Sequence, residues 1–223
     1  MTSYVLTKKF DTKVKLSPNV AAVSSMFGLG NRPGREMIVV DNCKVKIESG
    51  QVVYITGGSG AGKSQIFKML YEQMQANAKK KGVGFKEILN LGELEVPTGR
   101  PLVDCFIDDH LSDVMSWLSM AGLSDAFAVL RNSEHLSDGQ RYRFKLALAL
   151  SINPDVIFID EFCSTLDRVT AAVVAHNVRK FANRFGTTFV VATSHDDMLE
   201  DLAPDVVMIK HLGSHCDVYY PGK

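Results

Sequence analysis

Residues 57–64 read Gly57-Gly58-Ser59-Gly60-Ala61-Gly62-Lys63-Ser64 and fit the spacing G-x-x-x-x-G-K-S. An apolar run, Val52-Val53-Tyr54-Ile55, precedes this stretch, and a run with helical spacing follows it from Gln65 to Gln75. The order strand, glycine loop, helix is typical of a phosphate-binding loop. Glycines let successive N–H groups point into one concavity, and the next helix adds its positive dipole end. In this context a chance glycine-rich turn is disfavoured, and the stretch predicts a nucleoside triphosphate site.

The residues of this loop have separate predicted roles. Lys63 supplies a point charge for the β- and γ-phosphates, and the Ser64 hydroxyl is a predicted Mg²⁺ ligand. The whole loop and Gln65 after it are predicted to surround the nucleotide.

A second motif, Val156-Ile157-Phe158-Ile159-Asp160-Glu161, joins four apolar residues to two acids. Continuous apolar runs of this length are typical of strands buried on both faces in a parallel sheet. Asp160 is then predicted to hold Mg²⁺, directly or through water, at the strand end. Glu161 is predicted to polarise the attacking water as the catalytic base. Two acids can simply end a strand, but their pairing with the glycine loop favours the functional interpretation.

Composition sets outer limits on the fold and on its partners. The chain has 223 residues, 46% of them hydrophobic, with 25 basic and 25 acidic side chains. This balance predicts one globular domain without a broad basic surface for nucleic acid. Four scattered cysteines indicate neither zinc nor disulfides, and no apolar run reaches the length of a membrane span or a signal peptide. We therefore expect a cytoplasmic protein.

The order of elements predicts an α/β fold with a mainly parallel sheet, because runs with strand and helix spacing alternate after residue 50. Residues 1–55 read as strands and turns, which predicts an antiparallel β section. Residues 101–130 read as helical, with a break at Gly122 and a second short helix capped by Ser124.

A third motif, Leu136-Ser137-Asp138-Gly139-Gln140, opens a strongly helical run and ends 20 residues (160 − 140) before Asp160. By itself it is a helix cap. In this position it resembles the signature Leu-Ser-Gly-Gly-Gln of the ATP-binding cassette (ABC) ATPases. That resemblance implies ATP and Mg²⁺ as ligands, and it assigns Ser137, Gly139 and Gln140 to nucleotide binding.

The rest of the family pattern can be followed along the chain. Ser164-Thr165-Leu166-Asp167 resembles the D-loop and adds Asp167 to the nucleotide site. Thr193-Ser194-His195-Asp196 resembles the switch segment, in which His195 would sense the γ-phosphate and position water or the base. For the aromatic residue that stacks on adenine, Phe27 is the first candidate and Tyr4 the second; a core aromatic is the plain alternative.

The resemblance covers about residues 20–210 and implies one ABC-type P-loop NTPase domain over residues 1–223. Its parts would be the β section (1–55), a nucleotide-binding core (56–92 and 150–223) and a helical signature subdomain (93–149). The combined motifs look closest to soluble ABC ATPases that are often joined to an acetyltransferase domain.

Two departures from the family pattern affect coupling. Asp138 replaces a glycine in the signature and should point away from phosphate or act as a helix cap. No glutamine lies between Gln75 and Gln140, where the family carries one that couples to Mg²⁺ and to membrane subunits. Residues 97–100 occupy the expected place, with Thr98 and Arg100 as candidate substitutes.

The resemblance implies ATP hydrolysis by a head-to-tail homodimer with ATP in its interface. The missing glutamine favours a switch that acts on an unidentified soluble protein or nucleoprotein partner. The alternatives are the energising subunit of a membrane transporter and an ATP-dependent clamp that does not hydrolyse ATP.

Overall fold

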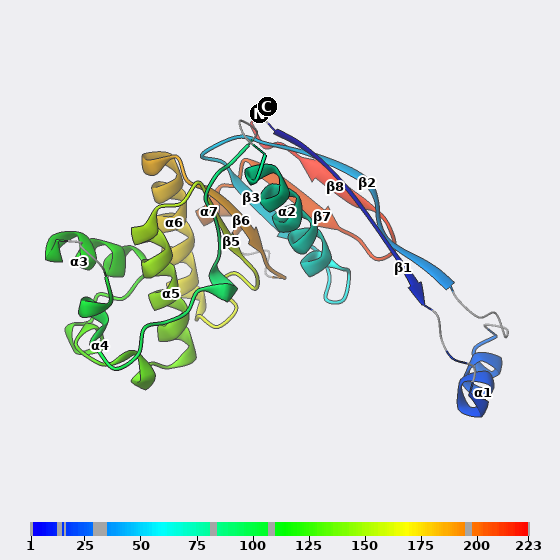
Figure 1. Cartoon of the computed structure of the whole chain (residues 1–223), viewed down its shortest axis with the longest axis horizontal. Helices are drawn as coiled ribbons and strands as arrows, with labels where there is room; N and C mark the ends of the chain where they lie inside the picture. The colour runs from blue at the N-terminus through cyan, green and yellow to red at the C-terminus, as the bar shows by residue number, and fades with distance from the viewer. Residues whose placement is uncertain are drawn as a thin grey trace.

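The computed structural model describes residues 2–12, 15, 17–28, 35–80, 84–106, 110–194 and 198–222. Its centre is a six-stranded sheet in the order β4-β5-β6-β3-β7-β8 (Figure 1). The strands are β3 (Val52–Thr56), β4 (Ile88–Asn90), β5 (Val156–Ile159), β6 (Thr188–Ala192), β7 (Val206–Lys210) and β8 (Cys216–Tyr219). The first five strands of that order are parallel, and β8 pairs antiparallel with β7. The predicted α/β class with a mainly parallel sheet is confirmed.

The two faces of this sheet bury different side chains, because successive residues of a strand point to opposite sides. Tyr54, Ile157 and Phe189 belong to the cluster that also contains buried residues of α5 (Asp138–Ile152) and α6 (Arg168–Phe185). The strand residues next to these three, whose side chains point to the other face, belong to a second cluster with α2 (Lys63–Ala78). Helices therefore cover both faces, as expected for strands that are apolar throughout.

An antiparallel pair, β1 (Thr2–Thr12) and β2 (Arg35–Ile47), forms an arm whose inner part packs beside α2. The arm projects from the core and leads at its far end to α1 (Pro18–Met26) (Figure 1). The expectation of only strands and turns before residue 55 is wrong at this helix. Ser17 caps α1 by accepting the Val20 N–H, and Pro18 occupies its first turn.

Shorter helical segments complete the fold. They are α3 (Leu111–Met120), α4 (Ala126–Val129), α7 (Leu199–Leu202) and the 3-10 turns η1 (Leu91–Glu93), η2 (Leu102–Cys105) and η3 (Ser133–His135). Gly122 ends α3 with a φ of 80°, as predicted, but the cap of α4 is Asp125 rather than Ser124. The Asp125 carboxylate accepts the Phe127 N–H at 3.0 Å. Within the described part of the chain, no helix is long and apolar enough to cross a membrane.

Candidate functional site

A pocket of about 320 Å³ lies at the carboxyl ends of the parallel strands, where ligands bind in sheets of this kind. Its lining residues come from the glycine loop, from the turn after β5 and from the end of β6. They are Ser59, Gly60, Lys63, Ser64, Asp160, Glu161, Ser164, Ala192, Thr193 and Ser194. The first six are sequence-predicted site residues, so the fold brings the phosphate loop and the acid pair into one cavity.

Two residues of the glycine loop have no room for a side chain. A Cβ at Gly57 would lie 2.1 Å from the Lys210 carbonyl oxygen, and one at Gly62 would lie 2.8 Å from Val39 Cγ1. Their φ angles, 141° and 105°, also fall in the region that side chains rarely adopt. By contrast, a Cβ at Gly58 would meet no described atom within 4 Å. The strand order thus places β7 directly against the loop and fixes its path.

Lys63 and Ser64 begin α2 at the floor of the pocket. Gly62 is the left-handed N-cap of this helix, so its first N–H groups open toward the loop. The Lys63 ammonium donates hydrogen bonds to the carbonyl oxygens of Gly57, at 2.8 Å, and Gly58, at 3.0 Å. Gln65 is half-buried in the first helical turn, and its N–H bonds the Gly62 carbonyl. The arrangement concentrates positive charge where phosphate groups are predicted to bind.

The donors at this site fit a magnesium ion presented by a nucleotide. Ser64 and Asp160 offer a hydroxyl and a carboxylate to the same pocket. Among the described residues, no group of three or more His, Cys, Asp or Glu side chains could hold a metal by itself. Magnesium often takes one or two protein ligands and completes its shell with water and substrate phosphate oxygens.

The turn that carries the acids has an unusual backbone, and we call residues 160–167 the acid turn. Glu161 and Cys163 have φ angles of 51° and 58°, in the left-handed region that disfavours side chains. The Glu161 N–H bonds the Asp160 carboxylate at 3.0 Å, and the Phe162 N–H bonds the Ala192 carbonyl at 2.8 Å. Phe162 is fully buried, whereas both acids are exposed to the pocket. Buried neighbours thus hold a strained turn that points its carboxylates outward.

The signature motif begins α5. Ser137 caps the helix by accepting the Gln140 N–H at 3.3 Å, and the Gln140 side chain accepts the Ser137 N–H at 3.1 Å. Asp138 is the exposed first residue of α5 and not its cap, so that alternative for Asp138 is wrong. Gly139 faces the acid turn, since a Cβ there would lie 3.2 Å from the Thr165 carbonyl oxygen. The described residues that line the phosphate-loop pocket do not include Ser137, Gly139 or Gln140.

Asp167 ends the acid turn as the N-cap of α6. Its carboxylate accepts the Thr170 hydroxyl at 2.6 Å and the Thr170 N–H at 3.0 Å. These bonds, the hydroxyl first, lower the pKa of the Asp167 carboxyl. The described lining of the pocket ends at Ser164 and Ser194 and does not reach Asp167.

The remaining predicted residues do not join the pocket in the described structure. Phe27 is the C-cap of α1 and 73% exposed, and α1 lies at the far end of the arm (Figure 1). Tyr4 is only 2% exposed and belongs to the core cluster beside α2, so it offers no open ring face for adenine. His195 lies outside the described residues, although Thr193 and Ser194 just before it line the pocket.

The loop expected to replace the missing glutamine is bonded elsewhere. The Pro97 carbonyl accepts the Ser133 hydroxyl at 2.5 Å, and the Gly99 N–H bonds Glu134 at 2.6 Å. The described residues in the pocket lining do not include Thr98 or Arg100.

An amide that the sequence reasoning missed is Asn90, the last residue of β4. It lines a groove with Asp160, because β4 pairs directly with β5. Its position at the end of a predicted strand was the signal that could have identified it.

Comparison with known proteins places these observations in a family. Residues 40–164 match the family model described as ABC transporter. The cell division ATP-binding protein FtsE of Bacillus subtilis (strain 168) is 26% identical over 195 residues, which cover 77% of this chain and 85% of FtsE. The methionine import ATP-binding protein MetN of Corynebacterium efficiens is 28% identical over 208 residues, which cover 81% of this chain. The chain spans 57% of that relative's length.

A solved structure agrees over nearly the whole chain. It is a dimeric ATP-binding cassette in a post-hydrolysis state bound to ADP and Pi, with a TM-score of 0.62 and 16% identity. The superposition covers 97% of this chain and 98% of the cassette, which shows a common fold.

The family match spans more than half of the 223 residues and contains both the glycine loop and the acid pair. The same two motifs meet in one pocket with donors that suit magnesium and phosphate. The chain therefore belongs to the ATP-binding cassette family and is an ATPase that uses ATP with Mg²⁺.

Proposed function

We propose that this chain hydrolyses ATP as a head-to-tail homodimer and that closure of the dimer drives a membrane-embedded partner. The observation that supports the dimer is that the predicted site residues lie in two separate places on one copy. The phosphate loop and the acid pair share a pocket, whereas the described residues that line it include none of the signature residues Ser137, Gly139 and Gln140. A second copy would supply those residues to the open side of the nucleotide, as the family resemblance implies.

Within one such site the residues have distinct proposed roles. Lys63 and the α2 N-terminus bind the phosphates, and Glu161 orients and deprotonates the attacking water. Ser64 and Asp160 would hold a magnesium ion, which would neutralise charge on the phosphate oxygens. His195 is proposed to sense the γ-phosphate and to position water or Glu161, as the family resemblance implies. Closure is favoured because ATP contacts both copies only in the closed state.

The membrane-embedded partner is supported by the relatives, whose names refer to cell division and to methionine import. They favour the transporter-type alternative over the soluble switch that the sequence alone suggested. The soluble switch keeps one observation in its favour, since residues 76–139 contain no glutamine for the usual coupling loop. The nature of the partner is therefore the point that an experiment must decide.

The dimer is tested with Glu161→Gln, which keeps the shape of the side chain and removes the base. Light scattering after size exclusion should show a stable dimer with ATP and Mg²⁺ and a monomer with ADP. Glu72→Gln is the matched control, because Glu72 is an exposed carboxylate on α2, 60% accessible. It should behave like the wild type. A Glu161→Gln protein that stays monomeric with ATP and Mg²⁺ would overturn the head-to-tail proposal.

The partner is tested by capturing tagged Glu161→Gln with ATP and Mg²⁺ from detergent extracts of the source cells. An integral membrane protein that raises the wild-type ATPase rate when both are reconstituted in vesicles supports the proposal. A soluble protein that stimulates the ATPase without a membrane supports the rival switch instead.

A further inference from the structure

The acid turn is held in place by a side chain from the signature helix. Tyr142 lies on α5, two residues after Gln140, and its hydroxyl oxygen accepts the Cys163 N–H at 3.1 Å. The same oxygen lies 3.8 Å from Cys163 Sγ. Cys163 is one of the two left-handed residues of the turn, so this bond secures a backbone that local preferences oppose.

Both partners of this link are neutral over the working pH range. Burial raises the pKa of the Tyr142 hydroxyl well above its usual value. Burial likewise raises the pKa of the Cys163 thiol to about 12. The link therefore acts by geometry and does not depend on a charge.

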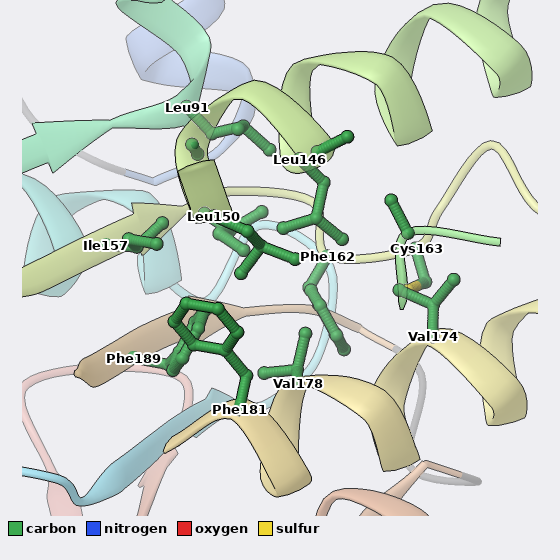
Figure 2. Close-up of a cluster of buried hydrophobic side chains, with 14 of the residues drawn as sticks. Leu91, Leu146, Leu150, Ile157, Phe162, Cys163, Val174, Val178, Phe181 and Phe189 are labelled. Carbon is green, nitrogen blue, oxygen red and sulfur yellow. The ribbon is translucent and has the colours of Figure 1, made fainter. Parts of the chain in front are cut away.

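Core packing links the position of Cys163 to the positions of the two acids. Phe162 and Cys163 are 0% and 2% exposed and belong to the same buried cluster as Val174 and Val178 of α6. Figure 2 shows the two side chains directed into that cluster, with Leu146 of α5 close by. Because this core is close-packed, we expect a displacement of Cys163 to reach Glu161 through the buried Phe162 between them.

The start of α5 also touches the acid turn at a second place. Gly139 of the signature packs against Thr165 and Leu166, where an added Cβ would lie at 3.2 and 3.4 Å. Arg143 fixes this end of the helix by donating hydrogen bonds to the carbonyl oxygens of Gly139, at 3.2 Å, and Gly122, at 2.6 Å. The signature and the acid turn of one copy therefore form a single packed unit.

We propose that Tyr142 is a positioning residue that makes the placement of Glu161 depend on whether the signature of the same copy is engaged. This inference rests on the proposed head-to-tail dimer. There, the signature of one copy contacts the second ATP, while Glu161 of that copy serves the first ATP. Engagement of one nucleotide then prepares the acid for the other, and the two ATP sites are coupled.

The test compares Tyr142→Phe with Tyr220→Phe. Tyr220 is a matched control, because its hydroxyl also accepts a backbone N–H, that of Lys46 in β2 at 2.9 Å. Tyr142→Phe should lower kcat roughly 10- to 100-fold, as expected when a reacting group is misplaced by up to about 1 Å. Its KM for ATP and its nucleotide affinity should stay within about twofold of the wild type.

Cooperativity is the readout that a purely structural role would not move. The wild type should hydrolyse ATP with a Hill coefficient above 1 and at most about 2, and Tyr142→Phe should bring it to about 1. Tyr220→Phe should keep the wild-type kcat and Hill coefficient, because its hydroxyl bonds an exposed backbone N–H. Tyr142→Phe combined with Glu161→Gln should still form the ATP-bound dimer.

Two results separate this inference from the proposed function. If Tyr142→Phe keeps kcat and cooperativity, or if Tyr220→Phe loses as much kcat, the positioning role is overturned and the dimer stands. If the wild type is not cooperative and Glu161→Gln never dimerises, the proposed dimer itself fails.

Discussion

Gly57→Ala should destabilise the protein through its contact with β7. The added Cβ would lie 2.1 Å from the Lys210 carbonyl oxygen, so backbone must move by about 0.9 Å to reach the shortest separation that real Cβ atoms show, 3.0 Å. Forcing a side chain into a packed site costs about 1–3 kcal/mol, and a φ of 141° adds about 1–3 kcal/mol. The expected loss is about 4 kcal/mol, which for a chain of this size corresponds to about 8–16 °C in Tm.

Thermal melting followed by circular dichroism measures this loss, with Gly58→Ala as the control. Gly58 belongs to the same loop, but a Cβ there would meet no described atom within 4 Å. Its variant should melt within about 2 °C of the wild type. A Gly57→Ala protein that melts as high as the wild type, or a Gly58→Ala protein that loses as much, would refute the argument that β7 dictates the path of the loop.

Three further predictions concern stability. Asp205→Ala removes a carboxylate that pairs with Arg179 at 2.6 Å and should cost roughly 2–4 kcal/mol in urea unfolding, whereas Glu72→Ala, at an exposed pair 3.9 Å long, should cost under about 0.5 kcal/mol. Asp167 contributes stability above the unfolded pKa of about 3.9 and loses it as pH falls through its lowered folded pKa, because a threonine hydroxyl bonds the charged form. The stability advantage of the wild type over Asp167→Asn should therefore shrink between pH 6 and pH 3 in urea titrations. Phe27→Ala should leave Tm unchanged within about 2 °C, since the ring is 73% exposed; a larger loss would show that the ring is buried in solution.

Most of the sheet and half of the site could be predicted because their signals are local. Continuous apolar runs identified β3 and β5, and the fixed spacing of the glycine loop identified its neighbour α2. Parallel strands then bring Ser64 and Asp160 to one edge without further information. Each of these conclusions depends on residues that are close in the sequence or on a general rule of sheet geometry.

What the sequence did not reveal depends on weak or long-range signals. Helix α1 has no buried residue, so it lacks the apolar periodicity that identifies amphipathic helices. The bond between Tyr142 and Cys163 joins residues 21 positions apart, and no pattern in the intervening chain indicates it. Asn90 does not stand out in the sequence because the family pattern has a glutamine, whereas the groove beside Asp160 is lined by a shorter amide from the neighbouring strand.

The backbone at Glu161 has a consequence for how this sequence can change. Its side chain is exposed, and its φ of 51° is one that glycine adopts without strain. A glycine here would relieve the turn and leave no cavity, so selection for thermal stability alone would discard the carboxylate. Selection for ATP turnover would keep it. Laboratory evolution that selects only for thermal stability should therefore yield variants that are more stable but have lost ATPase activity. A substitution at position 161 should be among the first to appear.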